Sequence, residues 1–271
     1  MLIKDPKITI ITCSYNSERY IADCIESVNS QTYKNIEHIF IDGGSTDSTL
    51  QVIKSKSPNA RVISEKDNGP YDAFNKGIKM ASGDIIGFLH SDDYFVNEKA
   101  LGRVVAAFSN NNIDYYSSTM RVIDLESNRE IAVLGDVPHK PTFREQILRS
   151  SYYAHPANYF LKNVFAAVGP FKLNYRIAAD IDWLIRMEKL GLKFVFEPEP
   201  LLNFRASGVS SKHMLRGSVE EFKIRIKHNG FTISLCIATV FHLVRRIIKI
   251  TFTVCGFKNI IWVSRKFLKY R

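Results

Sequence analysis

The stretch from Ile8 to Asp42 reads ITIITCSYNSERYIADCIESVNSQTYKNIEHIFID, and its hydrophobic period changes twice. Residues 8–13 form a run rich in β-branched side chains, which predicts a buried strand. Residues 17–31 carry apolar side chains at helical spacing, and residues 36–42 are again typical of a strand. A strand, a helix and a second strand in this order indicate parallel strands connected by a covering helix.

The same alternation continues towards residue 110. A Gly-Gly-Ser-Thr turn precedes a helix expected over 47–56, and a short strand is expected at 60–64. A turn at 68–70 leads into a helix over 71–80, and DIIGFL at 84–89 is typical of a fourth strand. We therefore predict an α/β protein with a Rossmann-like, mostly parallel sheet flanked by helices.

Polar and acidic residues follow all four predicted strands. In open parallel sheets, ligands bind outside the carboxyl ends of the strands. Turn chemistry explains any one of these exits, but it explains the four together less well. The exits read Cys13–Ser14–Tyr15–Asn16, Asp42–Gly43–Gly44–Ser45, Glu65–Lys66–Asp67 and Ser91–Asp92–Asp93.

Two adjacent acids, Asp92 and Asp93, end the fourth strand in the stretch DIIGFLHSDDYF. Like charges this close raise each other's pKa unless a cation neutralises them. The pair is either an ordinary strand exit or half of a metal site, and His90 stands just before it.

The alternation loosens beyond residue 110. Residues 179–190 predict a helix, with Asp180 at its N-cap and Gly191 just past its end. The other expected elements are a strand over 114–124, a short helix over 141–150, and strand or helix pieces within 155–169 and 191–198.

Four blocks of the sequence together resemble a known family. ITIITCSYNSERYIADCIESVNSQTY, IDGGSTDST, GDIIGFLHSDD and ADIDWLIRM are similar in order and spacing to the family-2 glycosyltransferases with a GT-A fold, over roughly residues 7–210. The segment SEKDNGPYDAFNKGI, followed by SDD, most resembles the corresponding segments of bacterial enzymes that build O-antigen and other surface polysaccharides. The resemblance implies inverting transfer of a sugar from a nucleotide-diphosphate donor to an acceptor hydroxyl, assisted by Mg²⁺ or Mn²⁺.

The resemblance also implies roles on the donor side. Asp92 and Asp93 match the carboxylates that hold the metal, which neutralises the charge that develops on the leaving diphosphate. Asp42 matches an acid that helps to hold the nucleoside. The other implied donor-side residues are Cys13, Tyr15 and Asn16 in the loop against base and ribose, Asp72 in the segment bordering the donor, and Ser91 beside the acid pair.

On the acceptor side, Asp180 matches the carboxylate that takes the acceptor's proton. The alternative for Asp180 is a plain helix N-cap, worth about 0.5–2 kcal/mol. Asp182 is the second candidate, or serves only to favour the helix dipole. His155 matches a position near the acceptor, and its alternative is a structural hydrogen-bonding role.

The chain departs from the family's pattern at two positions. The family commonly has DDGS where this chain has Asp42–Gly43–Gly44–Ser45, so an acid that often contacts the base is missing. The metal motif is commonly Asp-x-Asp, and here its first position is His90, which suits Mn²⁺ better than Mg²⁺. We expect His90 to point towards the donor's ribose and the acids after it to coordinate the metal.

The net charge of +10 lies in the C-terminal part of the chain. Residues 222–271 contain 11 Lys and Arg and no Asp or Glu, which leaves 26 basic and 27 acidic side chains in residues 1–221. The 14-residue apolar stretch 231–244 is shorter than the ~20 residues that span a bilayer. We expect residues 231–271 to lie as a basic amphipathic helical tail on an anionic membrane surface; the alternatives are packing on the catalytic body or a dimer contact, which would make a homo-oligomer.

These observations predict a catalytic domain over 1–215 and a membrane-association segment over 216–271. Within the first, 1–110 would bind the nucleotide and 111–215 the acceptor. Four scattered cysteines and no apolar leader favour the cytoplasm, at the inner face of the plasma membrane. No nucleic-acid-binding motif accompanies the basic charge, so we expect no nucleic-acid partner.

The function predicted is that of an inverting, metal-dependent glycosyltransferase. A UDP-sugar is favoured as donor, and a lipid-linked glycan as acceptor. A nucleotide-sugar-binding module without turnover is the alternative, because His90 and Gly43 depart from the family's pattern. A dehydrogenase is disfavoured, because no G-x-G-x-x-G follows the first strand.

Overall fold

The computed structural model describes residues 3–124, 128–135, 155–205 and 214–230. The chain divides into two units, residues 1–208 and 209–271, which are described separately below. The predicted helix over 141–150 and the tail over 231–271 lie outside the described residues.

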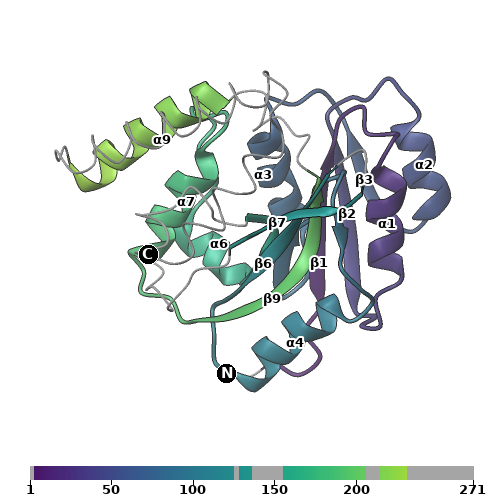
Figure 1. Ribbon diagram of the computed structural model, residues 1–271, viewed down its shortest axis with the longest axis horizontal. Coiled ribbons are helices and arrows are strands. Elements are labelled where there is room, and N and C mark those ends of the chain that lie inside the picture. The colour runs from purple at the N-terminus through teal and green to yellow at the C-terminus, as the bar shows by residue number, and fades with distance from the viewer. Residues whose placement is uncertain (1–2, 125–127, 136–154, 206–213, 231–271) are drawn as a thin grey trace. The chain divides into compact units, whose positions relative to one another are not determined.

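The first unit contains one sheet with the strand order β3-β2-β1-β4-β8-β6-β9-β5, and β7 pairs with β6 (Figure 1). The described strands are β1 (Ile8–Ser14), β2 (Ile36–Asp42), β3 (Arg61–Ser64), β4 (Ile85–Phe88), β5 (Tyr94–Phe95), β6 (Tyr115–Ile123), β7 (Glu130–Leu134), β8 (Asn158–Leu161) and β9 (Phe194–Arg205).

The sheet is parallel in its first half and mixed in its second. Strands β3, β2, β1 and β4 are all parallel, with Ile8 of β1 opposite Ile36 on one side and Ile85 on the other. Strand β8 runs antiparallel to both β4 and β6, whereas β6 and β9 are parallel. The prediction of parallel strands is confirmed for the N-terminal half, and the carboxyl ends of those strands meet at one edge.

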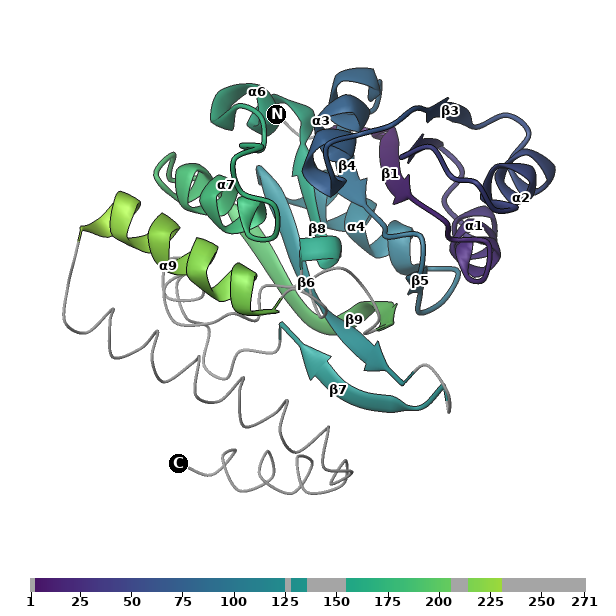
Figure 2. The ribbon, with the colours of Figure 1, turned by 90° about the horizontal axis from the view of Figure 1, so that it is seen from above.

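Helices cover both faces of the sheet (Figure 2). Helices α1 and α4 pack with Ile8 and Ile10 of β1, and α3 lies on the opposite face, where Gly77 approaches Ile11. The described helices are α1 (Ile21–Asn29), α2 (Thr49–Lys56), α3 (Pro70–Met80), α4 (Ala100–Asn110), α6 (Lys162–Val168), α7 (Ala179–Glu188), α9 (Met214–Asn229) and the short 3₁₀ turn η1 (His155–Ala157).

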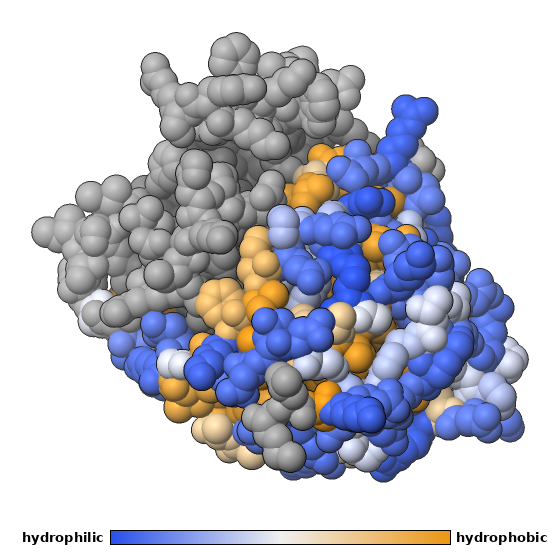
Figure 3. Space-filling view, turned by 90° about the horizontal axis from the view of Figure 1, so that it is seen from below, coloured by the Kyte–Doolittle hydropathy of each residue, from blue (hydrophilic) through white to orange (hydrophobic). Residues whose placement is uncertain are grey.

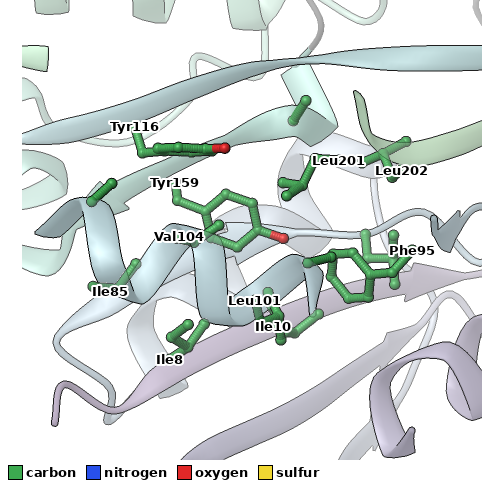
Figure 4. Packing of buried hydrophobic residues seen from close by; sticks show 14 of the residues in the cluster. Ile8, Ile10, Ile85, Phe95, Leu101, Val104, Tyr116, Tyr159, Leu201 and Leu202 are labelled. Atoms are coloured by element: carbon green, nitrogen blue, oxygen red, sulfur yellow. The ribbon is translucent and has the colours of Figure 1, made fainter. Parts of the chain in front are cut away.

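The largest apolar cluster joins strands from both halves of the sheet. Figure 4 shows Ile10 and Leu101 beside Phe95 of the two-residue strand β5, with Tyr159 of β8 nearby. The ring of Tyr159 lies so close to β4 that a Cβ on Gly87 would be 2.2 Å from its Cε1 atom. This packing fixes β4, and therefore the loop that carries the acid pair.

Eight large apolar side chains are exposed among the described residues. On the one face that Figure 3 draws, hydrophilic side chains alternate with separate apolar areas. Among the large apolar side chains that the structure describes, Tyr15 is the most exposed, at 65%. An aromatic ring left in solvent at the end of a central strand is available to a ligand.

The sequence placed most elements correctly in this unit. The helix predicted over 179–190 is α7, but its N-cap is Ala178, and Asp180 lies in the first turn without capping the helix. The region 155–169 resolves into η1, β8 and α6. Its apolar side chains serve a short strand and a short helix in succession, so no single period was visible.

The second unit is described only through α9. Ion pairs one helical turn apart, Arg216–Glu220 and Arg225–Glu221, support this helix. None of the described helices combines the length and the hydropathy that a membrane-spanning helix needs.

Candidate functional site

The loops after β1 and β2 are joined by Asn16. Its backbone N–H donates to Ser45 Oγ at 2.8 Å, and its Oδ1 accepts from the backbone N–H of Thr46 at 2.9 Å. Asn16 has a left-handed backbone with φ of 47°, which Asn tolerates better than most residues. The residue therefore fixes the relative position of the two loops that were predicted to surround the nucleoside.

Asp42 organises the loop after β2. Its buried carboxylate accepts from the hydroxyls of Ser14, Ser45 and Ser64 and from the backbone N–H groups of Gly44 and Ser45. Burial alone would raise the pKa of Asp42, but these hydrogen bonds outweigh it and lower the pKa. Asp42, predicted to help hold the nucleoside, uses both oxygens within the protein, so it shapes the loop that would hold the ligand.

Asp67, from the loop after β3, lies against Gly43. A Cβ on Gly43 would be 2.9 Å from Asp67 Oδ2 and 3.5 Å from Cδ2 of Tyr15. Burial, and then the charge of Asp67, raise the pKa of the Cys13 thiol well above its usual range. Asp67, which the sequence analysis gave only as part of a strand exit, therefore lies near Cys13 and Tyr15 at the carboxyl edge of the sheet.

The two adjacent acids have different environments. Asp93 is fully buried; its Oδ1 accepts from the backbone N–H of Arg205 at 3.0 Å, and its Oδ2 has no hydrogen-bond partner among the described residues. Burial, and then the charge of Asp92, raise the pKa of Asp93 well above its usual range, which favours a protonated Asp93. Asp92 is partly exposed. The two adjacent acids therefore differ in burial, with Asp93 inside the protein and Asp92 at its surface.

Arg205 anchors the loop that carries Asp92 and Asp93, called the acid loop below. Its guanidinium donates to the backbone carbonyl of Asp92 at 3.0 Å and pairs with Asp23 of α1 at 2.6 Å. It lies between the rings of Tyr20 and Tyr94, at 4.8 and 4.6 Å from their centroids. The sequence analysis missed Arg205, because an arginine at the end of an apolar strand carries no local signal of its partners.

The residues before the acids contact two other parts of the site. The Ser91 hydroxyl lies 2.9 Å from that of Ser17, which joins the acid loop to the loop after β1. The ring of His90 lies 5.8 Å from that of Phe74 in α3. Burial lowers the pKa of His90, although the charge of Asp92 opposes this.

His155 lies within an aromatic cluster. Its ring stacks on Phe88 at 5.1 Å and lies 5.7 Å from Phe74. Burial, and then the charge of His90, lower the pKa of His155 to about 3, so the ring is neutral. The structure therefore surrounds this predicted acceptor-side histidine with packing contacts.

Asp180 is held by helix α3. The hydroxyl of Tyr71 contacts Asp180 Oδ1 at 2.9 Å and the backbone carbonyl of Ile177 at 2.8 Å. Asp72, the next residue of α3, accepts from the backbone N–H of Asn68, so its carboxylate stabilises the turn before the helix. Because α3 also carries Phe74, one helix borders both the acid loop and Asp180.

Asp182 does not fit an acceptor-side role. It is fully buried and pairs with Arg186 at 2.8 Å and with Lys172 at 3.4 Å. Arg186 also donates to the backbone carbonyls of Val168 and Pro170. Asp182 therefore ties α7 to the segment after α6, and of the two acids proposed for proton transfer, Asp180 is the partly exposed one.

The acid loop fits a divalent cation through one carboxylate. No group of three or more His, Cys, Asp or Glu that could hold a metal occurs among the described residues. Mg²⁺ commonly takes only one or two protein carboxylates and completes its shell with phosphate oxygens and water. Asp92 suits this arrangement because it is partly exposed. Asp93 is buried, and its hydrogen bond to the backbone of Arg205 supports the acid loop inside the protein.

The sequence also matches a known protein family and several of its members. The sequence profile of Glycosyl transferase family 2 matches residues 9–176, more than half of the chain. The chain belongs to the family-2 glycosyltransferases. Relatives of this glycosyltransferase include an uncharacterised glycosyltransferase of Mycobacterium tuberculosis, 33% identical over 186 residues, with 67% of this chain and 68% of the relative covered. A PGL/p-HBAD biosynthesis glycosyltransferase of Mycobacterium bovis is 31% identical over 193 residues, which cover 67% of this chain and 69% of the relative.

Solved structures show the same fold. Staphylococcus aureus TarS residues 1–349 with UDP superposes with a TM-score of 0.61 at 20% identity, over 82% of this chain and 66% of that chain. The mannosyltransferase PcManGT from Pyrobaculum calidifontis with GDP-Man and Mn²⁺ superposes with a TM-score of 0.63 at 17% identity, over 85% of this chain and 66% of that chain. The glycosyltransferase thus has the predicted GT-A fold, and it spans about two thirds of each of these chains.

Proposed function

We propose that this glycosyltransferase moves a sugar from a UDP-sugar to an acceptor hydroxyl with inversion at the anomeric carbon. The observation that carries the proposal is the placement of α3 between the acid loop and Asp180. Tyr71 of that helix contacts Asp180 at 2.9 Å, and Phe74 contacts His90, two residues before Asp92. A donor diphosphate at the acid loop and an acceptor hydroxyl at Asp180 would then border the same helix.

The reaction divides between these groups. The acceptor oxygen bonds to the anomeric carbon while the bond to the diphosphate breaks, and Asp180 takes the hydroxyl proton. Tyr71 orients the Asp180 carboxylate for that transfer. A divalent cation held by Asp92 would neutralise charge on the leaving nucleoside diphosphate.

Two further features support the choice of substrates. TarS was solved with UDP and with UDP-GlcNAc, and the mycobacterial relatives include enzymes of PGL/p-HBAD biosynthesis. We therefore propose a UDP-sugar as donor, with Mn²⁺ or Mg²⁺, and a lipid-linked glycan of bacterial surface polysaccharide synthesis as acceptor. The basic tail over 231–271 would hold the protein on the inner face of the plasma membrane.

The experiment is a donor panel on the full chain with Mn²⁺ or Mg²⁺, measuring nucleotide release and sugar transfer. Asp180→Asn should lower kcat by about 10²-fold or more, because a general base contributes on that order, while donor affinity stays unchanged. Glu188→Gln, at the other end of α7, is the matched control and should keep wild-type activity. Full transfer by Asp180→Asn would refute the assignment of the base. UDP binding without any turnover by the wild type would favour a binding module.

Membrane association needs its own test. Full-length protein should float with liposomes that contain anionic lipid and stay behind with neutral ones. Recovery in the unbound fraction with both would refute the role of the tail.

A further inference from the structure

The space above Gly43 is filled by a carboxylate from another loop. A Cβ on Gly43 would meet Asp67 Oδ2 at 2.9 Å and Cγ at 3.4 Å, so a side chain at 43 would require the Asp67 carboxylate to shift. Gly43 has an ordinary backbone φ, so the constraint on a side chain here is the nearby Asp67 carboxylate and not the backbone. The acid missing after Asp42 is thus replaced in space by an acid from the loop after β3.

We propose that Asp67 determines which nucleobase this enzyme accepts, by taking a hydrogen bond from the ring N–H of uracil. This inference rests on the proposed function, because it assigns the base of the donor in that same site. It names a residue that the four sequence blocks did not contain, 24 positions after the place where the family commonly carries its base-contacting acid.

The neighbours of Asp67 suit a planar base. Tyr15 is 65% exposed, and Cδ2 of its ring lies 3.5 Å from the position that a Gly43 Cβ would take. An aromatic ring beside a nucleobase stabilises it by stacking, without preference for one base. Tyr15 therefore supplies a stacking surface, and the choice between bases falls to the polar group beside it.

The hydrogen bonding of Asp67 selects uracil. Its Oδ1 accepts from the backbone N–H of Gly69 at 2.8 Å, and its Oδ2 has no hydrogen-bond partner among the described residues. One available acceptor matches the single ring N–H of uracil, whereas guanine offers two adjacent N–H donors that need both oxygens. Cytosine presents a lone pair at the same ring position, which a carboxylate repels.

The test is calorimetric binding of UDP, CDP and GDP to the full chain in the presence of Mn²⁺. The wild type should bind UDP at least about tenfold more tightly than CDP, because a hydrogen bond to a charged group is worth about 1.5–3 kcal/mol. Asp67→Asn should abolish or reverse this preference. Its Oδ1 keeps the bond to Gly69, so its amide N–H₂ faces the base and matches the cytosine lone pair.

A second test changes position 43 and leaves the hydrogen bond between Asp67 and Gly69 in place, so that an effect on the turn at Gly69 is not mistaken for an effect on the base. Gly43→Asp should weaken UDP binding by about 10- to 100-fold, because two carboxylates compete for one place, and Gly43→Asp/Asp67→Ala should restore it. Glu65→Gln, on the same loop, is the matched control and should keep the UDP preference.

The outcomes separate the inference from the function. An unchanged UDP-to-CDP ratio in Asp67→Asn, or tighter binding of GDP than of UDP by the wild type, would overturn the role of Asp67 even if sugar transfer is observed. A base preference that follows Asp67 would support it even if the donor panel shows no transfer and the proposed function fails.

Discussion

Replacement of Arg205 by Met should loosen the acid loop without emptying the core around it. The Met side chain keeps the apolar stem that packs between Tyr20 and Tyr94 but removes the guanidinium. The hydrogen bond from the Arg205 backbone N–H to Asp93 is kept, because it does not involve the side chain. The lost interactions are therefore the bond to the Asp92 carbonyl, the pair with Asp23 and the two ring contacts.

The magnitude follows from the burial of each contact. The charged hydrogen bond to the Asp92 carbonyl is worth about 1.5–3 kcal/mol. Each ring contact adds about 0.5–1 kcal/mol. The Asp23 side chain is 50% exposed, so its pair with Arg205 adds at most about 1 kcal/mol. Because these terms share one group and are not additive, we expect a loss of about 3 kcal/mol in the free energy of unfolding.

Two measurements on the same variant check this reasoning. Urea unfolding should show the loss in stability, and titration with UDP should show a larger loss of affinity with Mn²⁺ than without it, because Asp92 is displaced. Arg121→Met is the control, since its pair with Glu130 is about half-exposed and should contribute less than about 1 kcal/mol. A stability loss below about 1 kcal/mol for Arg205→Met, or an equal loss of UDP affinity with and without Mn²⁺, would refute the role of Arg205.

Three further perturbations test other parts of the structure. Tyr71→Phe should lower kcat by roughly fivefold with donor KM unchanged, because one hydrogen bond of about 1 kcal/mol to the proposed base is lost; steady-state kinetics with wild-type kcat would contradict this. Gly87→Ala should lower the free energy of unfolding by about 1–3 kcal/mol, because its Cβ would lie 2.2 Å from the Tyr159 ring, whereas Gly102→Ala, with nothing within 4 Å, should not; equal melting temperatures would contradict the packing. Burial alone would raise the pKa of Glu37, but its hydrogen bonds outweigh burial and lower the pKa from 4.5 to about 2. The ionised Glu37 side chain therefore stabilises the fold above pH 4.5, and this contribution is lost as the pH falls towards 2. Glu37→Gln should reduce the slope of unfolding free energy against pH in that range by at most about 1.4 kcal/mol per pH unit, and parallel curves would exclude this.

The parallel half of the sheet was predictable because its signals are local. The β-branched run at Ile8 and the helical spacing up to Gln31 each lie within one element, and a right-handed crossover then places the next strand beside the first. Since parallel strands end at the same edge, the strand exits that contain Tyr15, Asp67 and Asp92 were predictable as neighbours.

The second half of the sheet was not predictable in the same way. Strand β5 has only two residues and owes its existence to pairing with β9, where Tyr94 lies opposite Asn203. Arg205 reaches the carbonyl of Asp92 across 113 positions of sequence. Neither partner of such a pair carries a local mark of the other, because the contact exists only once the strands are in register.

The sequence by itself determined the fold class, the edge of the sheet where the candidate site lies and the residue types gathered there. Only the tertiary structure separated the acids from one another: Asp42 and Asp182 are buried and bonded within the protein, Asp93 is buried with a raised pKa, and Asp92 and Asp180 are partly exposed. The physical reason is that the charge and reach of a carboxylate depend on its burial and its hydrogen-bond donors, and those donors come from distant parts of the chain.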